Sequence, residues 1–312
     1  MKLFRLTLFL LSVALSSCIG EDRDNCSSEN NLILRFSYVI DSGDELFVSR
    51  VEQTEVFIFD ESGCLLRQET IGTSSLDAAQ SVGLTLSPGT YRVVCWGNML
   101  EKTGVCPLSS STRIEDAFIY NTTLQGGSAT NCDPLYYSPG SAADALAGYY
   151  FTVPPTGSVT KTLDFTCAHI KLQVFISGFT DPEGSGGNLP PVVQVGALET
   201  NGDFSMRPFG TVCNYSQPSA YQNISGVEMA TAYFNLPPFK DDNSLKLHIK
   251  KASDDATVTS VIIKDYMAAN GLSVENIEEA VIPIHITYGG TQNVDVSIGL
   301  PTWNDSPVVP EL

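Results

Sequence analysis

The sequence predicts an all-β protein built from two β-sandwich domains with short helices. Apolar residues alternate with polar ones at a period of two in most patterned segments, as in strands with one face on a core. Charged residues make up only 17% of the 312 residues, and serine, threonine, asparagine and glycine take their place. At about 150 residues per domain, this length suggests two domains. A Pro154-Pro155-Thr156-Gly157 turn divides them into residues 31–156 and 157–312.

The first thirty residues predict export and lipid attachment. Residues 1–17 have the pattern of a signal peptide, whose apolar run from Leu6 to Leu15 is too short to span a bilayer. The segment Leu15-Ser16-Ser17-Cys18 resembles a bacterial lipobox, so we expect Cys18 to be acylated and residues 18–30 to form a flexible leash. The acidic run after Cys18 resembles a surface-export signal of some lipoproteins. We therefore expect a lipid-anchored, surface-exposed protein of an outer membrane.

The N-terminal half contains five alternating segments that we expect to be strands: Leu32–Tyr38, Val51–Phe59, Val82–Leu86, Tyr91–Trp96 and Tyr149–Val153. Clusters of turn-forming residues separate several of them. Residues 97–148 are irregular apart from Ala117–Tyr120. A connection of that length is uncommon unless it carries function or small elements of its own.

The C-terminal half continues the strand pattern, with one change of phase. Apolar residues occupy odd positions from Leu163 to Cys167 and even positions from Ile170 to Ile176, which predicts a β-bulge or a strand that changes sheets. Further strands are expected at Leu245–Ile249, and in a closing hairpin at Ile282–Tyr288 and Val294–Leu300. Between them, Lys264–Ala280 is the best helix candidate, with an interruption at Asn270-Gly271.

The charge balance restricts the partners. The chain carries 17 Lys and Arg against 35 Asp and Glu, for a net charge of −18. Nucleic acid is therefore not an expected partner, because binding phosphates requires a basic surface. The same balance argues against electrostatic docking on anionic lipid.

The cysteines suggest a disulfide but no metal site. Seven of the eight cysteines remain once Cys18 is assigned to acylation, and no C-x-x-C motif occurs. Cys106 and Cys132 flank a loop-rich segment and are the candidate pair for a disulfide in an oxidising compartment. Cys95 and Cys167 lie in apolar strand-like runs and are expected to be buried thiols.

The sequence carries few signs of catalytic chemistry. The three histidines stand alone, and no P-loop, nucleophile elbow or dinucleotide motif is present. Cys167 and His169 could share a strand face as a nucleophile pair, but the change of phase lies between them and no orienting residue is evident. Tyrosines at 136, 137, 149 and 150 could stack on sugars, although such residues more often belong to a core. We expect no enzyme activity, no cofactor and no metal.

Several motifs occur in an order that resembles the FimB-type fimbrial anchor lipoproteins, which are related to the fimbrillins of type V pili. The lipobox is followed by Asp24-Asn25-Cys26 and then by an apolar strand. The segment Pro88-Gly89-Thr90-Tyr91 continues to Trp96-Gly97-Asn98, and Asp133-Pro134-Leu135-Tyr136-Tyr137 resembles a linker motif. The last hairpin, followed by Trp303, resembles the C-terminus of the family.

The resemblance implies two β-sandwich domains of transthyretin-like, fimbrillin type. It also implies a subunit that binds fimbrial pilins by strand exchange and has no enzyme activity. Pilins of this type are thought to lose their first strand to a protease that cuts after Arg or Lys, and Arg50 is a possible processing point here. An anchor is expected to keep that strand. The expected function is to hold the base of a fimbria in the outer membrane. The alternative is a fimbrial tip or accessory adhesin that binds a host glycan or protein, and a lipoprotein hydrolase is a remote third.

Overall fold

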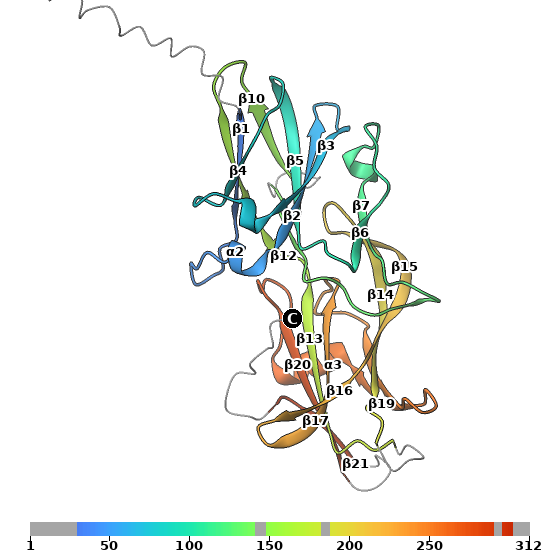
Figure 1. Cartoon of the computed structure of the whole chain (residues 1–312). Helices are drawn as coiled ribbons and strands as arrows, with labels where there is room; N and C mark the ends of the chain where they lie inside the picture. Colours follow the sequence, from blue (N-terminus) through green and yellow to red (C-terminus); the bar gives the residue numbers. More distant parts are fainter. Residues whose placement is uncertain (1–29, 141–147, 182–187, 290–294, 302–312) are drawn as a thin grey trace, which may run out of the picture.

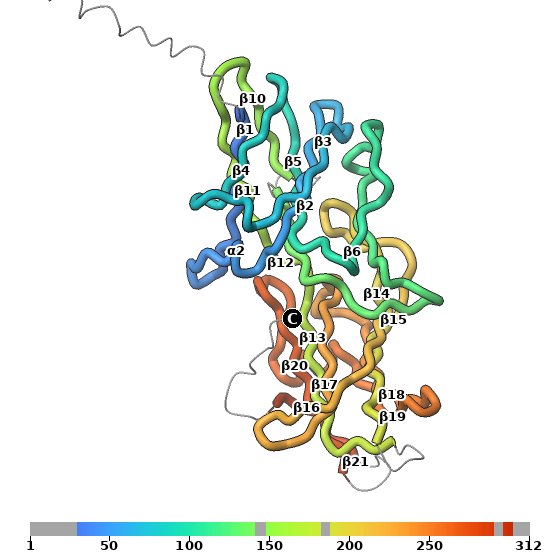
Figure 2. Tube along the Cα trace, in the orientation of Figure 1, coloured from blue at the N-terminus to red at the C-terminus, as the bar shows by residue number. Residues whose placement is uncertain are grey.

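The structure is a computed structural model that describes residues 30–140, 148–181, 188–289 and 295–301. The predicted signal peptide, Cys18 and most of the predicted leash lie outside these residues. Within them the chain forms two β-sandwich bodies placed end to end (Figures 1 and 2). The all-β prediction is therefore confirmed. No helix in the described part of the chain is long and apolar enough to cross a membrane.

The first body, uppermost in Figure 1, packs a three-stranded sheet against a six-stranded one. The smaller sheet has the order β11-β1-β4, and the larger has the order β12-β9-β5-β2-β3, with β10 also paired to β5. Its strands are β1 (Leu32–Ser37), β2 (Gln53–Asp60), β3 (Leu65–Gly72), β4 (Ser81–Leu84), β5 (Gly89–Gly97), β9 (Tyr136–Tyr137), β10 (Tyr149–Val153), β11 (Val159–Asp164) and β12 (Thr166–Cys167). A short helix, α2 (Phe47–Arg50), follows β1.

The second body packs a five-stranded sheet, β16-β17-β13-β20-β21, against a seven-stranded one built on β19-β18-β14-β15-β8 with β7 and β6 added beside β14. Its strands are β6 (Thr103–Val105), β7 (Phe118–Asn121), β8 (Ser128–Ala129), β13 (Ile170–Ser177), β14 (Val192–Asp203), β15 (Pro208–Pro218), β16 (Ala220–Ile224), β17 (Val227–Leu236), β18 (Lys246–Lys250), β19 (Thr257–Ile262), β20 (Val281–Gly289) and β21 (Asp295–Gly299).

Strand pairing divides the chain at different places from the predicted domain boundary. β11 and β12 follow residue 156 but pair with β1 and β9 of the first body, and the pairing changes only between Cys167 and Ile170. The predicted phase change is therefore a strand that switches sheets. In the other direction, β6, β7 and β8 lie within the long 97–148 connection but join the seven-stranded sheet of the second body. The domain boundary after Thr156 remains a prediction. In the structure, strands on each side of Thr156 belong to a sheet of the other body.

Half of the predicted helix is present. α3 (Ile263–Asn270) ends where Gly271 adopts a left-handed backbone with a φ of 65°, a conformation that glycine enters without the steric cost of a Cβ. Residues 272–280 are turns and irregular chain rather than a second helical segment. The interruption predicted at Asn270-Gly271 is therefore the end of the helix.

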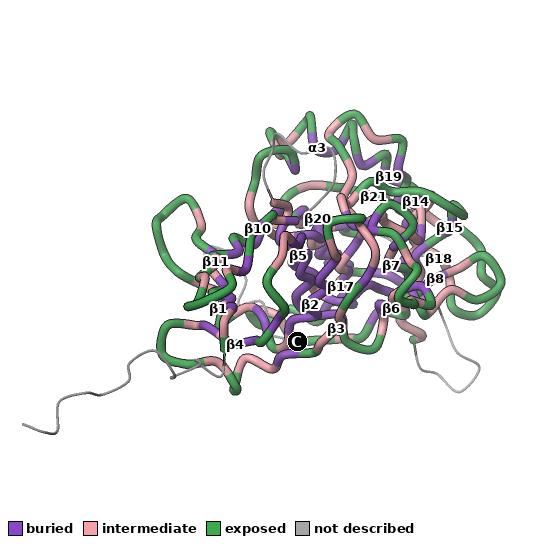
Figure 3. The backbone as a smooth tube through the Cα atoms, turned by 90° about the horizontal axis from the view of Figure 1, so that it is seen from above, coloured by how far each residue is buried: buried purple, intermediate pink, exposed green. Residues whose placement is uncertain are grey.

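Three apolar clusters hold the bodies together. One fills each sandwich, and the third lies on the outer face of the larger sheet of the first body, where it joins the two bodies. Figure 3 shows the buried residues concentrated along the strands in the middle of the molecule, with exposed loops around them. In the third cluster Phe204, between β14 and β15, is 2% exposed. Its ring centre lies 4.9 Å from that of Phe57 and 6.3 Å from that of Trp96 in the first body.

Candidate functional site at the first strand and the junction

The first strand occupies the middle of the smaller sheet. β1 pairs in parallel with β11 on one side and antiparallel with β4 on the other. The inward side chains of Leu32, Leu34 and Phe36 are at most 1% exposed. Removal of β1 would leave two unpaired strand edges and an apolar slot between them, which is the kind of surface that accepts a strand from another chain.

Arg50, the predicted processing point, is the last residue of α2 and lies at the junction of the two bodies. Its Nε donates to Oε1 of Glu279 at 2.9 Å. Glu279 lies just before β20 in the second body, so this ion pair connects the segment that contains β1 to the other body.

Glu279 has further partners in both bodies. Its Oε1 also accepts from the hydroxyl of Tyr136 at 3.0 Å and from that of Tyr38 at 3.4 Å, and Lys171 Nζ lies 4.0 Å from Oε2. Burial opposes ionisation of Glu279, but the hydrogen bond from Arg50 and the charge of Lys171 outweigh it, so that the pKa of Glu279 is lowered. Burial, with the Glu279 charge second, raises the pKa of Tyr38.

The peptide bonds on either side of Val51 are held by hydrogen bonds. The Asn98 side chain spans them, because its Nδ2 donates to the Arg50 carbonyl and its Oδ1 accepts from the Glu52 amide, both at 2.8 Å. The Val51 amide donates to the Phe47 carbonyl at 2.8 Å, and the Val51 side chain is 1% exposed. A protease needs an extended and accessible segment, and here the segment is helical, hydrogen-bonded and half covered. Cleavage after Arg50 therefore requires local opening.

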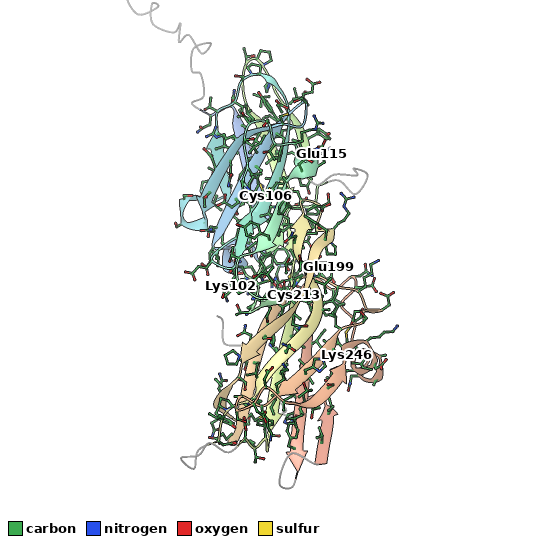
Figure 4. All side chains as sticks on the ribbon, turned by 90° about the vertical axis from the view of Figure 1, so that its right-hand side faces the viewer. Lys102, Cys106, Glu115, Glu199, Cys213 and Lys246 are labelled. Atoms are coloured by element: carbon green, nitrogen blue, oxygen red, sulfur yellow. The ribbon has the colours of Figure 1, made fainter. Side chains whose placement is uncertain are left out.

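Cys106 and Cys132, the predicted disulfide pair, are both buried free thiols in the structure. Cys106 Sγ accepts from the Phe118 amide. Cys132 Sγ lies 3.8 Å from the Tyr215 hydroxyl in the second body, and burial raises the pKa of Cys132 to about 11. The pairing expected from their loop-rich surroundings is not formed, because each thiol is packed into its own set of contacts. Figure 4 shows Cys106 in the upper part of the view, just after β6, and Cys213, another free thiol, nearer the middle of the molecule.

Cys167 and His169 do lie together, but not as an activated nucleophile. Cys167 Sγ is 3.3 Å from His169 Nδ1. However, Nδ1 lies 3.0 Å from the Leu135 carbonyl, which only accepts, so Nδ1 carries the proton and cannot take one from the thiol. Burial raises the pKa of Cys167 to about 12 and lowers that of His169 to about 4, the reverse of a thiolate–imidazolium pair.

The four tyrosines considered as sugar platforms have different surroundings. Tyr136 is 1% exposed and belongs to the core, whereas Tyr150 is 52% exposed. Tyr137 stacks on Trp96, and Tyr149 lies under Lys161. Only Tyr150 therefore presents a largely open ring. Among the described residues no cluster of three or more His, Cys, Asp or Glu side chains could hold a metal ion.

The comparisons with known proteins bear on this arrangement of a buried first strand and two interlocked sandwiches. The family model of the Fimbrillin-A associated anchor proteins Mfa1 and Mfa2 matches residues 23–305. The chain belongs to this family. It is thus a fimbria-associated protein of a structural family, in agreement with the resemblance seen in the sequence. No curated protein matched the sequence.

Solved structures share the fold of this family member. A candidate adhesin from Bacteroides ovatus is 16% identical with a TM-score of 0.67, and the match covers 87% of this chain and 94% of that one. A candidate polysaccharide-binding protein from Bacteroides thetaiotaomicron is 13% identical with a TM-score of 0.65, covering 86% and 96%. The fimbrial anchor protein Mfa2 from Porphyromonas gingivalis is 12% identical with a TM-score of 0.58, also covering 86% and 96%. At these identities the likeness establishes the fold alone.

Proposed function

We propose that this chain is an outer-membrane lipoprotein that anchors the base of a fimbria and binds pilin by strand exchange. The observation that carries the proposal is the first strand itself, which is buried and paired on both sides. β1 occupies its place in the smaller sheet. The Arg50 carbonyl accepts a hydrogen bond from Asn98, and the Arg50 side chain is paired with Glu279. A subunit that keeps this strand stays joined to everything that precedes it, including Cys18.

The direction of the chain supports a lipid anchor at the end of the first body that lies farthest from the second body. β1 begins at the end of the first body that lies farthest from the second body (Figure 1). A lipid at Cys18 would therefore attach at that end and leave the second body farthest from the membrane. Acylation with more than one chain makes such an attachment nearly permanent.

Pairing with a pilin needs an open strand edge, and the second body offers one. Among the described strands β21 pairs only with β20. Its Val296 and Ile298 side chains are 39% and 40% exposed. An edge strand with unpaired backbone groups and exposed apolar side chains is a site for strand addition. We place the pilin contact at this edge, because the slot in the first body is filled.

Lipid attachment is tested by growing the native cells with an alkyne analogue of palmitate and fractionating the membranes. The proposal predicts label on the wild-type chain in the outer membrane and none on Cys18→Ala. Cys26→Ala is the matched control and should keep both the label and the location. A second readout is the mass of the mature chain, which should still contain residues 18–50. Label that survives Cys18→Ala, or a mature chain that begins at Val51, would overturn the proposal.

A further inference from the structure

The outer face of the five-stranded sheet in the second body is covered. Along β13 the side chains of Leu172, Val174 and Ile176 belong to the core between the sheets. Gln173 and Phe175 alternate with them, so they point to the opposite, outer side of the sheet. Phe175 and Gln173 are nevertheless only 1% and 2% exposed. An outward position alone does not give such burial, so a further layer of chain lies on this face.

No strand or helix in the described part of the second body supplies this layer. Each of its described strands belongs to one of the two sheets, and α3 places Ile263, Tyr266 and Met267 in the core between them. Neighbours within a sheet stand beside an outward side chain and leave its tip open. The seven-stranded sheet shows the exposure that results, because Phe209 and Val212 on β15 are 40% and 52% exposed.

The C-terminal tail begins within reach of Phe175. β21, β20 and β13 lie side by side in this order (Figure 1), and Gly299, His285 and Phe175 form one row across them. At about 4.8 Å between neighbouring strands, Phe175 lies ~10 Å from Gly299. Trp303 follows Gly299 by four residues, which span up to ~13 Å when extended. The Trp303 ring can therefore reach the row that contains Phe175.

The composition of the tail suits a sheet face better than a sheet edge. Residues 302–312 carry the apolar side chains of Trp303, Val308 and Val309. Pro307 and Pro310 interrupt the segment, and proline lacks the amide hydrogen that pairing with a neighbouring strand requires. The tail thus combines apolar side chains with a backbone that is poorly suited to strand pairing.

We propose that residues 302–312 fold back over the outer face of the five-stranded sheet, with the Trp303 ring packed on Phe175. Contact between two aromatic rings buries a large apolar area. The tail then acts as a third layer of the second body, and it fastens the short edge strand β21 (Asp295–Gly299) to the rest of its sheet. This inference does not depend on the pilin contact proposed at the β21 edge.

The test follows Trp303 in the full mature chain by fluorine NMR after labelling with 5-fluorotryptophan. The chain has two tryptophans, Trp96 and Trp303, and Trp303→Phe assigns their signals. Compared with a peptide of residues 299–312, the Trp303 signal should be shifted and at least about threefold less sensitive to a soluble paramagnetic agent. Phe175→Ala should return it towards the peptide value. Phe209→Ala, at an exposed position of the other sheet, should leave it unchanged.

Two readouts keep the test decisive if Phe175→Ala fails to fold. The Trp96 signal reports folding, because Trp96 packs near Phe204 where the two bodies meet, and the wild-type measurement needs no variant. A peptide-like Trp303 signal in the folded wild type overturns the proposal, as does a shielded signal that folded Phe175→Ala leaves unchanged or that Phe209→Ala releases equally. Shielding that is lost on dilution also overturns it, because the cover is then a second copy of the chain.

Discussion

The carboxylate of Glu279 accepts a 2.9 Å hydrogen bond from Arg50, which lies 229 residues earlier in the chain and in the other body. This contact ties the segment that follows the first strand to the second body. The Arg50 guanidinium that a protease would bind is already held by Glu279. Access to Arg50 is therefore controlled by the second body.

Glu279→Ala should make the bond after Arg50 easier to cleave. Loss of a partly exposed ion pair is worth about 1 kcal/mol, so local opening, and with it cleavage by an arginine-specific protease, should become about fivefold faster. The rate is measured on the folded chain by mass spectrometry of the released segment. Glu278→Ala is the matched control, because Glu278 lies next in the chain but contacts Thr166 instead. Equal cleavage of the two variants would show that Glu279 does not protect this bond.

The same contact predicts a pH dependence. The pKa of Glu279 lies below its ordinary value of 4.5 in the folded chain. Its contribution to the free energy of unfolding is therefore present above about pH 4.5 and is lost as the pH falls through the lowered pKa. The difference in unfolding free energy between the wild type and Glu279→Gln should favour the wild type at pH 7 and shrink at pH 3. A difference that stays constant over this range would contradict the lowered pKa.

Phe204 should be the main apolar link between the bodies. Phe204→Ala removes a buried ring from between Phe57 and Trp96 and should lower the free energy of unfolding by about 3–5 kcal/mol. Phe209→Ala, at a 40% exposed position near the start of β15, should cost much less. Chemical denaturation of both variants compares them. Similar losses would mean that Phe204 is not specific to the junction.

The buried cysteines should be unreactive until the chain unfolds. Cys132 has a raised pKa of about 11 and Cys106 is 5% exposed, so alkylation of both should be slow in the native chain and fast in denaturant. Peptide mapping without reduction should recover the two cysteines in separate peptides. A cross-linked peptide that contains both would restore the disulfide predicted from the sequence.

Much of the fold could be predicted because alternation survives where one sheet face is buried. β1, β5, β13 and β20 follow the expected pattern. β14 was missed because a shift of register between Val195 and Leu198 breaks the alternation. β3 was missed because it is an edge strand in which only Leu65 and Ile71 are buried, so that it reads as polar.

The candidate site was predictable only in part. Arg50 could be singled out because the family resemblance implies cleavage after an Arg or Lys, and Asn98 ends the Trp96-Gly97-Asn98 motif. Their partners could not be found, because Glu279 meets Arg50 only after the two bodies fold together.

The central claim, that the chain anchors a fimbria through Cys18, is tested most directly in its own cells. Cys18→Ala and the control Cys26→Ala are compared by imaging fimbriae and by assaying pilin in cells and medium. The account predicts that Cys18→Ala alone sheds fimbriae into the medium or makes them abnormally long. Fimbriae retained at normal length in Cys18→Ala cells would contradict it and favour a tip or accessory adhesin.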